Sequence, residues 1–306
     1  MYEKYMDFNL KLEKIDSLIQ LAIQEDIGMG DITTENLIPD NLFVEGVFIA
    51  KENGTIAGLP VIEYFFSKLD KNVLFRYWVK DGISVNKGET IATISGSAKT
   101  LLSGERIALN FLQRLSGIAT HTAQFVERIK PLRTPIMDTR KTLPGWRYLE
   151  KYAVVMGGGV NHRIGLYDQV LIKDNHLDIM KNRLFLDLST DSIIERSVSL
   201  VRQKVKQGIL IEVETRTPKE VRDALEARAD IILFDNMNIE QLKEAVKIVK
   251  DWKSAGGTHL PVTEASGNIT LETVHLVAQT GVDRISAGAI THSAKAMDIS
   301  LEMSNY

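Results

Sequence analysis

From about residue 134 onward, short apolar runs alternate regularly with segments that have a helical pattern. The runs lie at residues 135–141, 169–176, 208–215, 230–236, 260–267 and 284–291. Strands that alternate with helices are typical of βα units, in which the strands are parallel and the helices cover the sheet. This pattern predicts an α/β fold with a parallel sheet, and six such strands favour a barrel.

The segments between the runs carry signals for the start of a helix. An N-cap residue followed three positions later by Glu or Gln forms a capping box, and a threonine or asparagine alone is also a good N-cap. The predicted caps are Thr217 with Glu220, Asn238 with Gln241, and Thr270 for a helix that ends near Gly281.

The first part of the chain is less regular. Residues 10–24 have the spacing of an amphipathic helix, and residues 102–129 have that of a long one, with Gly104 and Gly117 as possible breaks. Between them, residues 79–96 contain the Asp-Gly and Lys-Gly turns of a compact hairpin arrangement. We therefore expect a mixed α/β arrangement before the barrel.

Residues 79–96 also resemble the sandwich of biotinyl and lipoyl carrier domains. Such carriers modify a hairpin lysine that is flanked by Met or Ala, and no lysine of that kind stands in this segment. The structural interpretation, a plain sandwich, is favoured over a carrier role.

Each apolar run of the second part ends in polar residues. These are Asp138 and Arg140, Lys173 and Asp174, Glu212 and Glu214, Asp235 and Asn236, Glu264 and Ser266, and Ser286 with Gly288. In a barrel of parallel strands the C-terminal strand ends meet at one face, and that face carries the chemistry. The sequence therefore predicts a charged site at this face.

The charge of the whole chain restricts what such a site binds. The chain of 306 residues has a formal net charge of −3 and a pI of about 6.1. A general nucleic-acid binder needs a broad basic surface, so we expect no nucleic-acid partner. A local cationic site on a near-neutral protein suits a small anionic ligand.

Several other classes of site and location are disfavoured. The chain has no cysteine, which excludes disulfides, thiolate nucleophiles and cysteine-based metal sites. Residues 1–16 have no apolar signal core, and no window approaches the roughly 20 apolar residues that cross a bilayer. We expect a cytoplasmic protein without membrane contact. The glycines at 157–159 lack the spacing of a dinucleotide-binding motif, and no P-loop or zinc-protease motif is present.

Two kinds of charge are combined at the predicted face. Arg140, Lys141, His162, Arg163 and Lys173 supply donors for carboxylate or phosphate oxygens. The carboxylates of Glu214 and Asp235 supply hard oxygens, which favour Mg²⁺ that arrives with a phosphorylated substrate. The small residues at 265–268 and 286–289 are candidates for a phosphate cradle. From the residues alone, the chain is a barrel-like enzyme for small anionic substrates, and the reaction stays open.

Two long segments make the reaction more specific. They read DTRKTLPGWRYLEKYAV at 138–154 and GGGVNHRIGLYDQVLIKDNH at 157–176. Together with IEVET, LFDN, EASGNI and ISAGAITHSAKAMDISL, they resemble the quinolinate phosphoribosyltransferase family. The likeness extends through EDIGMGDITT and GERIALNFLQRLSGIAT, so it covers nearly the whole chain.

The resemblance implies an N-terminal α/β sandwich domain at residues 1–130 and a partly open α/β barrel at 131–290, whose C-terminal strand ends form the active site. The tail at 291–306 would pack back on the first domain. The implied reaction transfers phosphoribosyl from 5-phosphoribosyl 1-diphosphate to quinolinate with decarboxylation, a step of NAD biosynthesis. Mg²⁺ would bind with the diphosphate. Members of the family form homodimers, or assemblies of dimers, with a shared active site.

The resemblance also assigns residues. The quinolinate site would use Arg140, His162, Arg163 and Lys173, with Arg106 from a second subunit. Glu214 and Asp235 would hold the metal and act in catalysis, together with Lys141 and Lys173 near the diphosphate. The remaining phosphate would contact Ser266, Gly267, Gly288 and His292. One alternative is a related phosphoribosyltransferase that acts on nicotinate, which has one carboxylate less, or on a related pyridine or base. The other is a non-catalytic ligand-binding or carrier protein on the same scaffold.

Overall fold

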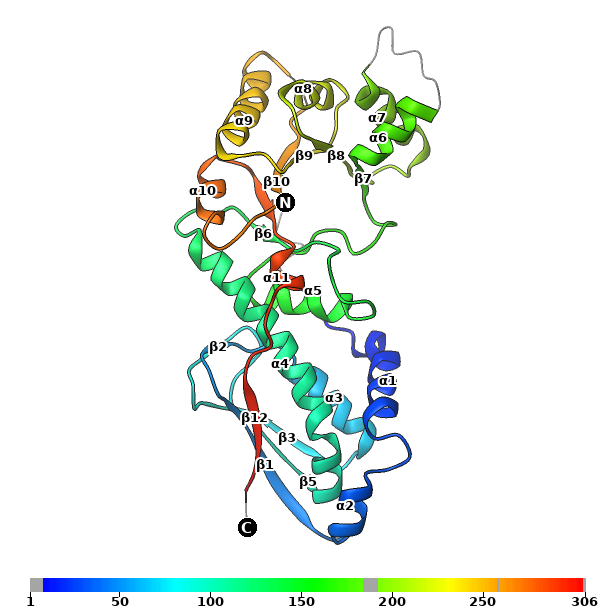
Figure 1. Cartoon of the computed structure of the whole chain (residues 1–306), viewed down its shortest axis with the longest axis vertical. Helices are drawn as coiled ribbons and strands as arrows, with labels where there is room; N and C mark the ends of the chain where they lie inside the picture. The colour runs from blue at the N-terminus through cyan, green and yellow to red at the C-terminus, as the bar shows by residue number, and fades with distance from the viewer. Residues whose placement is uncertain (1–7, 184–191, 258, 305–306) are drawn as a thin grey trace. The chain divides into compact units, whose positions relative to one another are not determined.

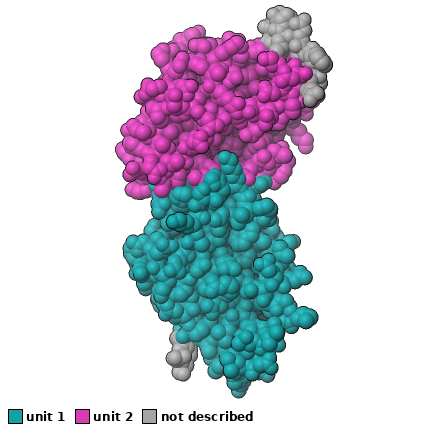
Figure 2. All heavy atoms as spheres, viewed as in Figure 1, with its two compact units in different colours: residues 1–124, 141–161, 290–306 teal, residues 125–140, 162–289 magenta. Residues whose placement is uncertain are grey.

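The computed structural model describes residues 8–183, 192–257 and 259–304. The chain divides into two compact units, which Figure 2 colours separately. Unit 1 comprises residues 1–124, 141–161 and 290–306, and unit 2 comprises residues 125–140 and 162–289.

This division differs from the expected boundary near residue 130, because residues 141–161 belong to unit 1. Two contacts explain the difference. The guanidinium of Arg114 lies 2.7 Å from the carboxylate of Glu150, and the rings of Phe111 and Trp146 stack with their centroids 4.8 Å apart. Segment 141–161 therefore packs on the long helix of unit 1.

Unit 1 is built on an antiparallel sheet. In the described residues this sheet has four strands in the order β12-β1-β5-β3. They are β1 (Phe43–Ala50), β3 (Leu74–Tyr77), β5 (Thr90–Ser97) and β12 (Ile299–Ser304) (Figure 1). Residues 299–304 of the tail thus pair with β1, from Ala50 with Ile299 to Glu45 with Ser304.

Helix α3 (Leu59–Leu69) packs on this sheet through aromatic side chains. Phe75 on β3 contacts Phe48 on β1 and Phe66 on the helix α3, with centroid distances of 5.9 and 6.2 Å. The other elements that lie in unit 1 or begin there are the 3-10 helix η2 (Leu12–Ile15), α1 (Asp16–Asp26), α2 (Ile32–Leu37), α3 (Leu59–Leu69), α4 (Ala98–Arg128), α5 (Arg147–Met156), β2 (Gly54–Thr55) and β4 (Ser84–Val85). The helix predicted at 10–24 is therefore confirmed as η2 and α1.

The hairpin expected within residues 79–96 is not formed. Strand β4 pairs with β2 in a small two-stranded ribbon, whereas β5 pairs with β1 and β3. The Lys-Gly turn at Gly88 returns the chain toward β1, because the amide of Gly88 donates to the carbonyl of Ala50 at 2.7 Å. Turn residues indicated the bends correctly but not which strands pair.

Helix α4 runs without interruption from Ala98 to Arg128, so neither Gly104 nor Gly117 breaks it. Both glycines instead let neighbouring segments of the chain pack closely against the helix. A Cβ at Gly104 would lie 2.5 Å from the ring of Phe66, and a Cβ at Gly117 would lie 1.9 Å from the carbonyl oxygen of Lys295. Sequence reasoning treats glycine as a helix breaker, whereas here tertiary packing requires it.

We expect Gly117→Ala to destabilise unit 1 by about 3 kcal/mol, although alanine alone would favour the helix by about 1 kcal/mol. The new methyl group meets backbone rather than a movable side chain, so the segment at Lys295 must shift. The midpoint of urea unfolding measures the effect. In the control Gly104→Ala the methyl meets the Phe66 ring, which can move, and the loss should be about 1 kcal/mol. A Gly117→Ala protein as stable as the wild type would contradict the packing argument.

Unit 2 contains the predicted parallel sheet, and all six apolar runs form its strands. In the described residues the order is β6-β11-β10-β9-β8-β7, and no pairing joins β6 to β7, so the barrel is open. The strands are β6 (Ile136–Met137), β7 (Val170–Ile172), β8 (Ile211–Thr215), β9 (Ile231–Asp235), β10 (Val262–Ser266) and β11 (Arg284–Ser286) (Figure 1). This confirms the fold class predicted from the sequence.

The connections of unit 2 are helical. They are α6 (Asp174–Arg183), α7 (Ile193–Lys204), α8 (Pro218–Glu226), α9 (Ile239–Ser254) and α10 (Val274–Gln279), and α11 (Ala289–His292) follows β11. Both predicted capping boxes are present, at Thr217 and at Asn238. The prediction for Thr270 was wrong, because α10 begins at Val274 and Thr270 forms a turn with Thr273.

Lys151 lies on α5 and is buried, with 1% of its surface exposed. Among the described residues, no helix is both long enough and apolar enough to cross a membrane.

Candidate functional site

The register of unit 2 brings the polar strand ends to one edge of the sheet. Ser266 of β10 is paired with Asp235 of β9 on one side and with Ser286 of β11 on the other. Ser286 is in turn paired with Met137 of β6, and Asp138 follows Met137 directly. Asp235, Ser266 and Ser286 therefore lie at one carboxyl-terminal edge of the sheet, with Asp138 one position further along the chain than Met137. Glu212 and Glu264 were also predicted as strand ends, but they lie inside β8 and β10.

Two arginines form the cationic part of this edge. Arg140 follows β6 and is half-buried, and Arg163 is buried with 8% of its surface exposed. Burial lowers the pKa of Arg163, and the nearby charge of Arg140 lowers it further, while Glu212 and Asp168 raise it. Two guanidinium groups held within reach of each other's charge favour an anion that binds both.

A second cluster lies where β7, β8 and β9 end. Lys173 Nζ lies 3.2 Å from Glu214 Oε2. Arg216, which follows β8, lies 2.6 Å from Asp174 Oδ2 and 3.5 Å from Glu214 Oε1, and its Nε lies 3.6 Å from Asp235 Oδ2. Lys173, Glu214 and Asp235 of the predicted set are thus brought together, with Arg216 between the two carboxylates.

The Glu214 and Asp235 pair fits a divalent cation. Burial raises the pKa of Glu214, Lys173 lowers it, and the neighbouring charge of Asp235 raises it again. Two adjacent carboxylates repel each other, and a cation between them removes this repulsion. Carboxylate oxygens are also the ligands that Mg²⁺ prefers. The donor set at this position therefore suits Mg²⁺ once Arg216, which lies 3.5 Å from Glu214 and 3.6 Å from Asp235, has moved aside. Unlike Arg284, Arg216 is half exposed and has room to move.

The turn after β10 is fixed by an asparagine from the turn after β9. Asn236 donates its amide N–H to the carbonyl of Ser266 at 2.9 Å, and its Oδ1 accepts from Asn268 Nδ2 at 3.0 Å. Gly267 has φ +96°, and a Cβ there would lie 2.2 Å from Asn236 Oδ1. Only glycine fits this position, which leaves the backbone after β10 open to a ligand.

Behind the arginines lies a buried charge network. His162 Nε2 lies 3.2 Å from Glu212 Oε2 and 3.4 Å from Glu264 Oε1, and both carboxylates are fully buried. Arg284 Nε donates to Glu264, and Arg284 Nη2 lies 3.5 Å from Glu212. These four side chains come from β8, β10, β11 and the segment before β7.

The carboxylates of this network and the backbone amide of Arg163 act in opposite directions on the pKa of His162. Burial alone would lower the pKa of His162, but Glu264 and Glu212 outweigh it and raise the pKa to about 10. The pKa of Glu264 is lowered, because His162 and Arg284 oppose the effect of burial. The amide of Arg163, 2.7 Å from His162 Nδ1, needs a lone pair there and so favours the neutral ring. This contact reduces the upward shift of the His162 pKa.

His162, Glu212 and Glu264 also have a spacing that a metal could use, since their ligand atoms all lie within 4.8 Å of one another. Arg284 pairs with both carboxylates, however, and its positive charge would repel a divalent ion. We therefore interpret this cluster as a charge-balanced network rather than a metal site.

Three predicted residues belong to unit 1. Arg106 is exposed on α4, and His292 is exposed at the end of α11. Lys141 is exposed, and its carbonyl accepts from Thr291 Oγ1 at 2.7 Å. Arg114 also donates to the carbonyls of Thr291 and Ala294, both at 2.9 Å. Unit 1 thus holds Lys141 beside the segment that carries His292.

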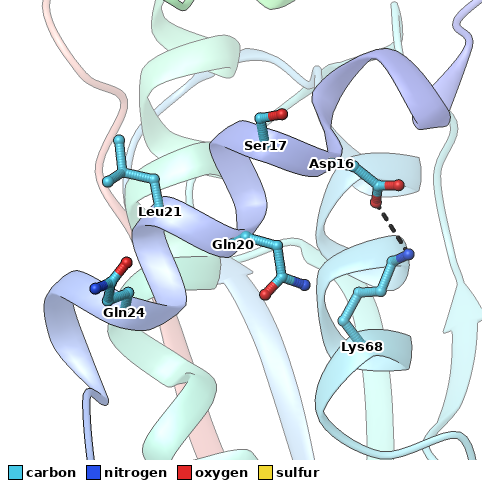
Figure 3. A pocket seen from close by; sticks show the side chains of 6 residues that line it. All are labelled: Asp16, Ser17, Gln20, Leu21, Gln24 and Lys68. Carbon is cyan, nitrogen blue, oxygen red and sulfur yellow. Dashed lines mark ion pairs between the residues drawn. The ribbon is translucent and has the colours of Figure 1, made fainter.

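Unit 1 also has a surface pocket between α1 and α3, with a volume of about 480 Å³. It is lined by Asp16, Ser17, Gln20, Leu21, Gln24 and Lys68 (Figure 3). Lys68 reaches from α3 to Asp16 on α1, at 2.9 Å. None of the sequence-predicted site residues lines this pocket.

Two family models match the chain. The model for the N-terminal domain of quinolinate phosphoribosyl transferase matches residues 31–116, and the model for the C-terminal domain matches residues 118–302. The chain belongs to the quinolinate phosphoribosyl transferase family.

Named relatives agree with this family. A probable nicotinate-nucleotide pyrophosphorylase (carboxylating) of Bacillus subtilis is 42% identical over 295 residues, which cover 96% of this chain and 94% of the relative. A mitochondrial quinolinate phosphoribosyltransferase (decarboxylating) of Nicotiana tabacum is 41% identical over 305 residues, which cover 94% of this chain and 82% of the relative.

A solved structure of a similar protein has the same fold as this chain. The nicotinate-nucleotide pyrophosphorylase of Francisella tularensis superposes with a TM-score of 0.85 at 34% identity, and the match covers 97% of this chain and 98% of that chain.

Three residues that contribute to the site of this chain were not predicted from the sequence. Arg216 stands two positions after Glu214, outside the apolar run, and its position just past a strand end was the available signal. Asn236 was noted only as a polar strand end, although its φ of +54° fits an asparagine that shapes a turn. Arg284 begins β11, and a charged residue at the start of a buried strand needs a buried partner, but the sequence does not show which one.

Proposed function

We propose that this chain transfers phosphoribosyl from 5-phosphoribosyl 1-diphosphate to quinolinate, with loss of carbon dioxide. The products are nicotinate mononucleotide, carbon dioxide and pyrophosphate, which places the reaction in the biosynthesis of NAD. Family membership supports this proposal. The observation that carries it is the placement of Arg140 and Arg163 within reach of each other's charge, at the same strand edge as Glu214 and Asp235.

The two carboxylates of quinolinate are assigned to the cationic edge. Arg140 and Arg163 present planar donors, and an arginine binds a carboxylate through two parallel hydrogen bonds. Lys173, whose side chain is 46% exposed, adds a third positive charge close to Glu214. A dicarboxylate needs more donors than a monocarboxylate, so this set favours quinolinate over nicotinate.

The diphosphate end is assigned to the acidic cluster. Glu214 and Asp235 would hold Mg²⁺, which, when bound, neutralises charge on the diphosphate as it leaves. Lys173 stabilises the same developing charge, and so does Lys141 in this proposal. The Glu214 carboxylate, buried and next to Asp235, also favours the positive charge that develops on the ribose ring.

The phosphate on the ribose is assigned to the backbone after β10 and β11. Gly267 keeps the first of these turns free of a side chain. Ser266 precedes Gly267 and is paired with Ser286, and Gly288 follows Ser286 by two positions. Backbone N–H groups and a serine hydroxyl are suitable phosphate donors. In this proposal His292 supplies a further donor.

The bond changes balance without a covalent nucleophile. The pyridine nitrogen of quinolinate attacks C1 of the ribose, and the C1–O bond to pyrophosphate breaks with its electron pair on oxygen. The positively charged ring then accepts the electron pair of the C2–carboxylate bond as carbon dioxide leaves. A proton takes the place of the carboxylate at C2, and Lys141 is our candidate for its donor.

We further propose that the chain forms a homodimer with shared sites, in which Arg106 of one copy reaches the quinolinate of the other. Arg106 is exposed on α4. An exposed arginine on the surface of one copy is available to complete the site of another.

A product assay tests the function. With quinolinate, 5-phosphoribosyl 1-diphosphate and Mg²⁺, we expect carbon dioxide and pyrophosphate to appear in equal amounts. Nicotinate in place of quinolinate should turn over about a hundredfold more slowly. It has only one carboxylate, so the arginine donors for the second carboxylate have no partner. Turnover of nicotinate alone would identify a related phosphoribosyltransferase instead, and binding of quinolinate without products would indicate a non-catalytic protein.

A further inference from the structure

We propose that His162 is a positioning residue that fixes Arg163, and that it does not itself bind the substrate. This assignment rests on the proposed function, which gives Arg163 to a carboxylate of quinolinate. It changes the role that the family resemblance implied for His162.

The first argument is that both ring nitrogens of His162 have partners. Nε2 faces Glu212 at 3.2 Å and Glu264 at 3.4 Å, and Nδ1 accepts the amide of Arg163 at 2.7 Å. The side chain is only 8% exposed. Since an imidazole has no third polar atom, a substrate carboxylate would have to displace one of these partners.

The second argument is that Glu212 holds both ends of the segment that carries Arg163. Its Oε2 receives His162 Nε2 at 3.2 Å and Gln169 Nε2 at 2.6 Å. The carbonyl of Gln169 in turn accepts from Arg163 Nη1 at 2.9 Å. One carboxylate on β8 thus fixes the start and the end of residues 162–169, and through them the guanidinium of Arg163.

The third argument is that further hydrogen bonds hold the segment. The carboxylate of Asp168 accepts from the amides of Ile164 at 2.7 Å and Gly165 at 3.1 Å. A Cβ at Gly165 would lie 2.4 Å from the ring of Tyr167, so this ring packs across the turn. The amide of His162 also donates to the buried carboxylate of Asp138 at 2.7 Å. A shift of His162 would therefore be passed on to Arg163.

The carboxylates that hold His162 are themselves held. Arg284 Nε donates to Glu264, and Arg284 Nη2 lies 3.5 Å from Glu212, and all three side chains are at least nine-tenths buried. Buried charges of this kind keep one arrangement, because any displacement leaves a charge without a partner. The network therefore provides a fixed base for the ring of His162.

A double-mutant cycle tests the assignment. The dissociation constant of quinolinate is measured by calorimetry for the wild type, His162→Asn, Arg163→Ala and the double variant. In the background with Arg163 intact, we expect His162→Asn to weaken quinolinate binding about tenfold. In the Arg163→Ala background, the same substitution should weaken it less than about twofold. Equal losses in both backgrounds would show that His162 binds the substrate directly, and no loss in the wild type would also overturn the proposal.

Gln169→Leu provides a milder variant that leaves the buried charges in place, in case His162→Asn does not fold. It removes the donor to Glu212 and should raise the KM for quinolinate about threefold. The kcat and the KM for 5-phosphoribosyl 1-diphosphate should stay within about twofold of the wild type. The effect should again disappear with Arg163→Ala, and its persistence there would overturn the proposal.

The results also distinguish the positioning role from the proposed function. Failure of the wild type to bind quinolinate would overturn the proposed function as well. Additive losses of binding in an active enzyme would overturn the positioning role alone.

Discussion

Replacing Arg140 with alanine is expected to raise the KM for quinolinate by roughly 30- to 1000-fold, because truncating a charge-assisted pair in a desolvated site costs about 2–4 kcal/mol. Arg140 is half-buried at the end of β6, and its charge acts on Arg163. Arg163 and Lys173 would remain, but one carboxylate of quinolinate would lose its bidentate partner. Steady-state kinetics at saturating 5-phosphoribosyl 1-diphosphate measure the change.

Arg133→Ala is the matched control for this prediction. Arg133 is an exposed arginine that precedes β6, whereas Arg140 follows it. The carboxyl-terminal edge of the sheet carries the proposed site, so the loss of Arg133 should leave the KM for quinolinate unchanged. Equal kinetics for Arg140→Ala and Arg133→Ala would remove Arg140 from the site.

Replacing Glu214 with alanine is expected to lower kcat about 10²- to 10³-fold while quinolinate still binds. Glu214 is buried beside Asp235, and its carboxylate contacts Lys173 and Arg216. Its removal takes away a proposed metal ligand and a charge that stabilises the ribose centre, neither of which quinolinate needs for binding. The kcat and the KM for 5-phosphoribosyl 1-diphosphate are measured together with the dissociation constant of quinolinate.

Glu226→Gln serves as the control for Glu214→Ala. Glu226 is an exposed residue at the end of α8, and its charge should not affect turnover. A Glu214→Ala enzyme with the kcat of the wild type would contradict the assignment of the acidic cluster. A variant that loses quinolinate binding and keeps its kcat would instead place Glu214 in the dicarboxylate site.

The barrel-like unit was predictable because its signals are local. Each strand is an apolar run, each run ends in a polar residue, and the parallel arrangement brings those ends to one edge. Glu214 and Lys173 are 41 residues apart in sequence and lie 3.2 Å apart, as strand ends of β8 and β7 should. The topology therefore follows from short sequence patterns, each of which predicts one strand or helix independently of the others.

The features that the sequence did not predict depend on contacts between distant segments. Gly117 looked like a break in a helix, because its need for space comes from Lys295. Strand β4 was expected in a hairpin, but its partner is β2. Arg284 gains its role only from Glu264 and Glu212, which lie on other strands. No local pattern contains these partners.

The position of β12 in the chain has a consequence for biosynthesis. β12 pairs with β1 in unit 1, yet the ribosome makes it only after every strand of unit 2. At about 5–20 residues per second, the roughly 200 residues between β5 and β12 take about 10–40 s to make, and β1 lacks this partner for that time. During that time its backbone edge can pair with another nascent chain. The completion of the N-terminal sheet is therefore a step of synthesis that is exposed to misassembly.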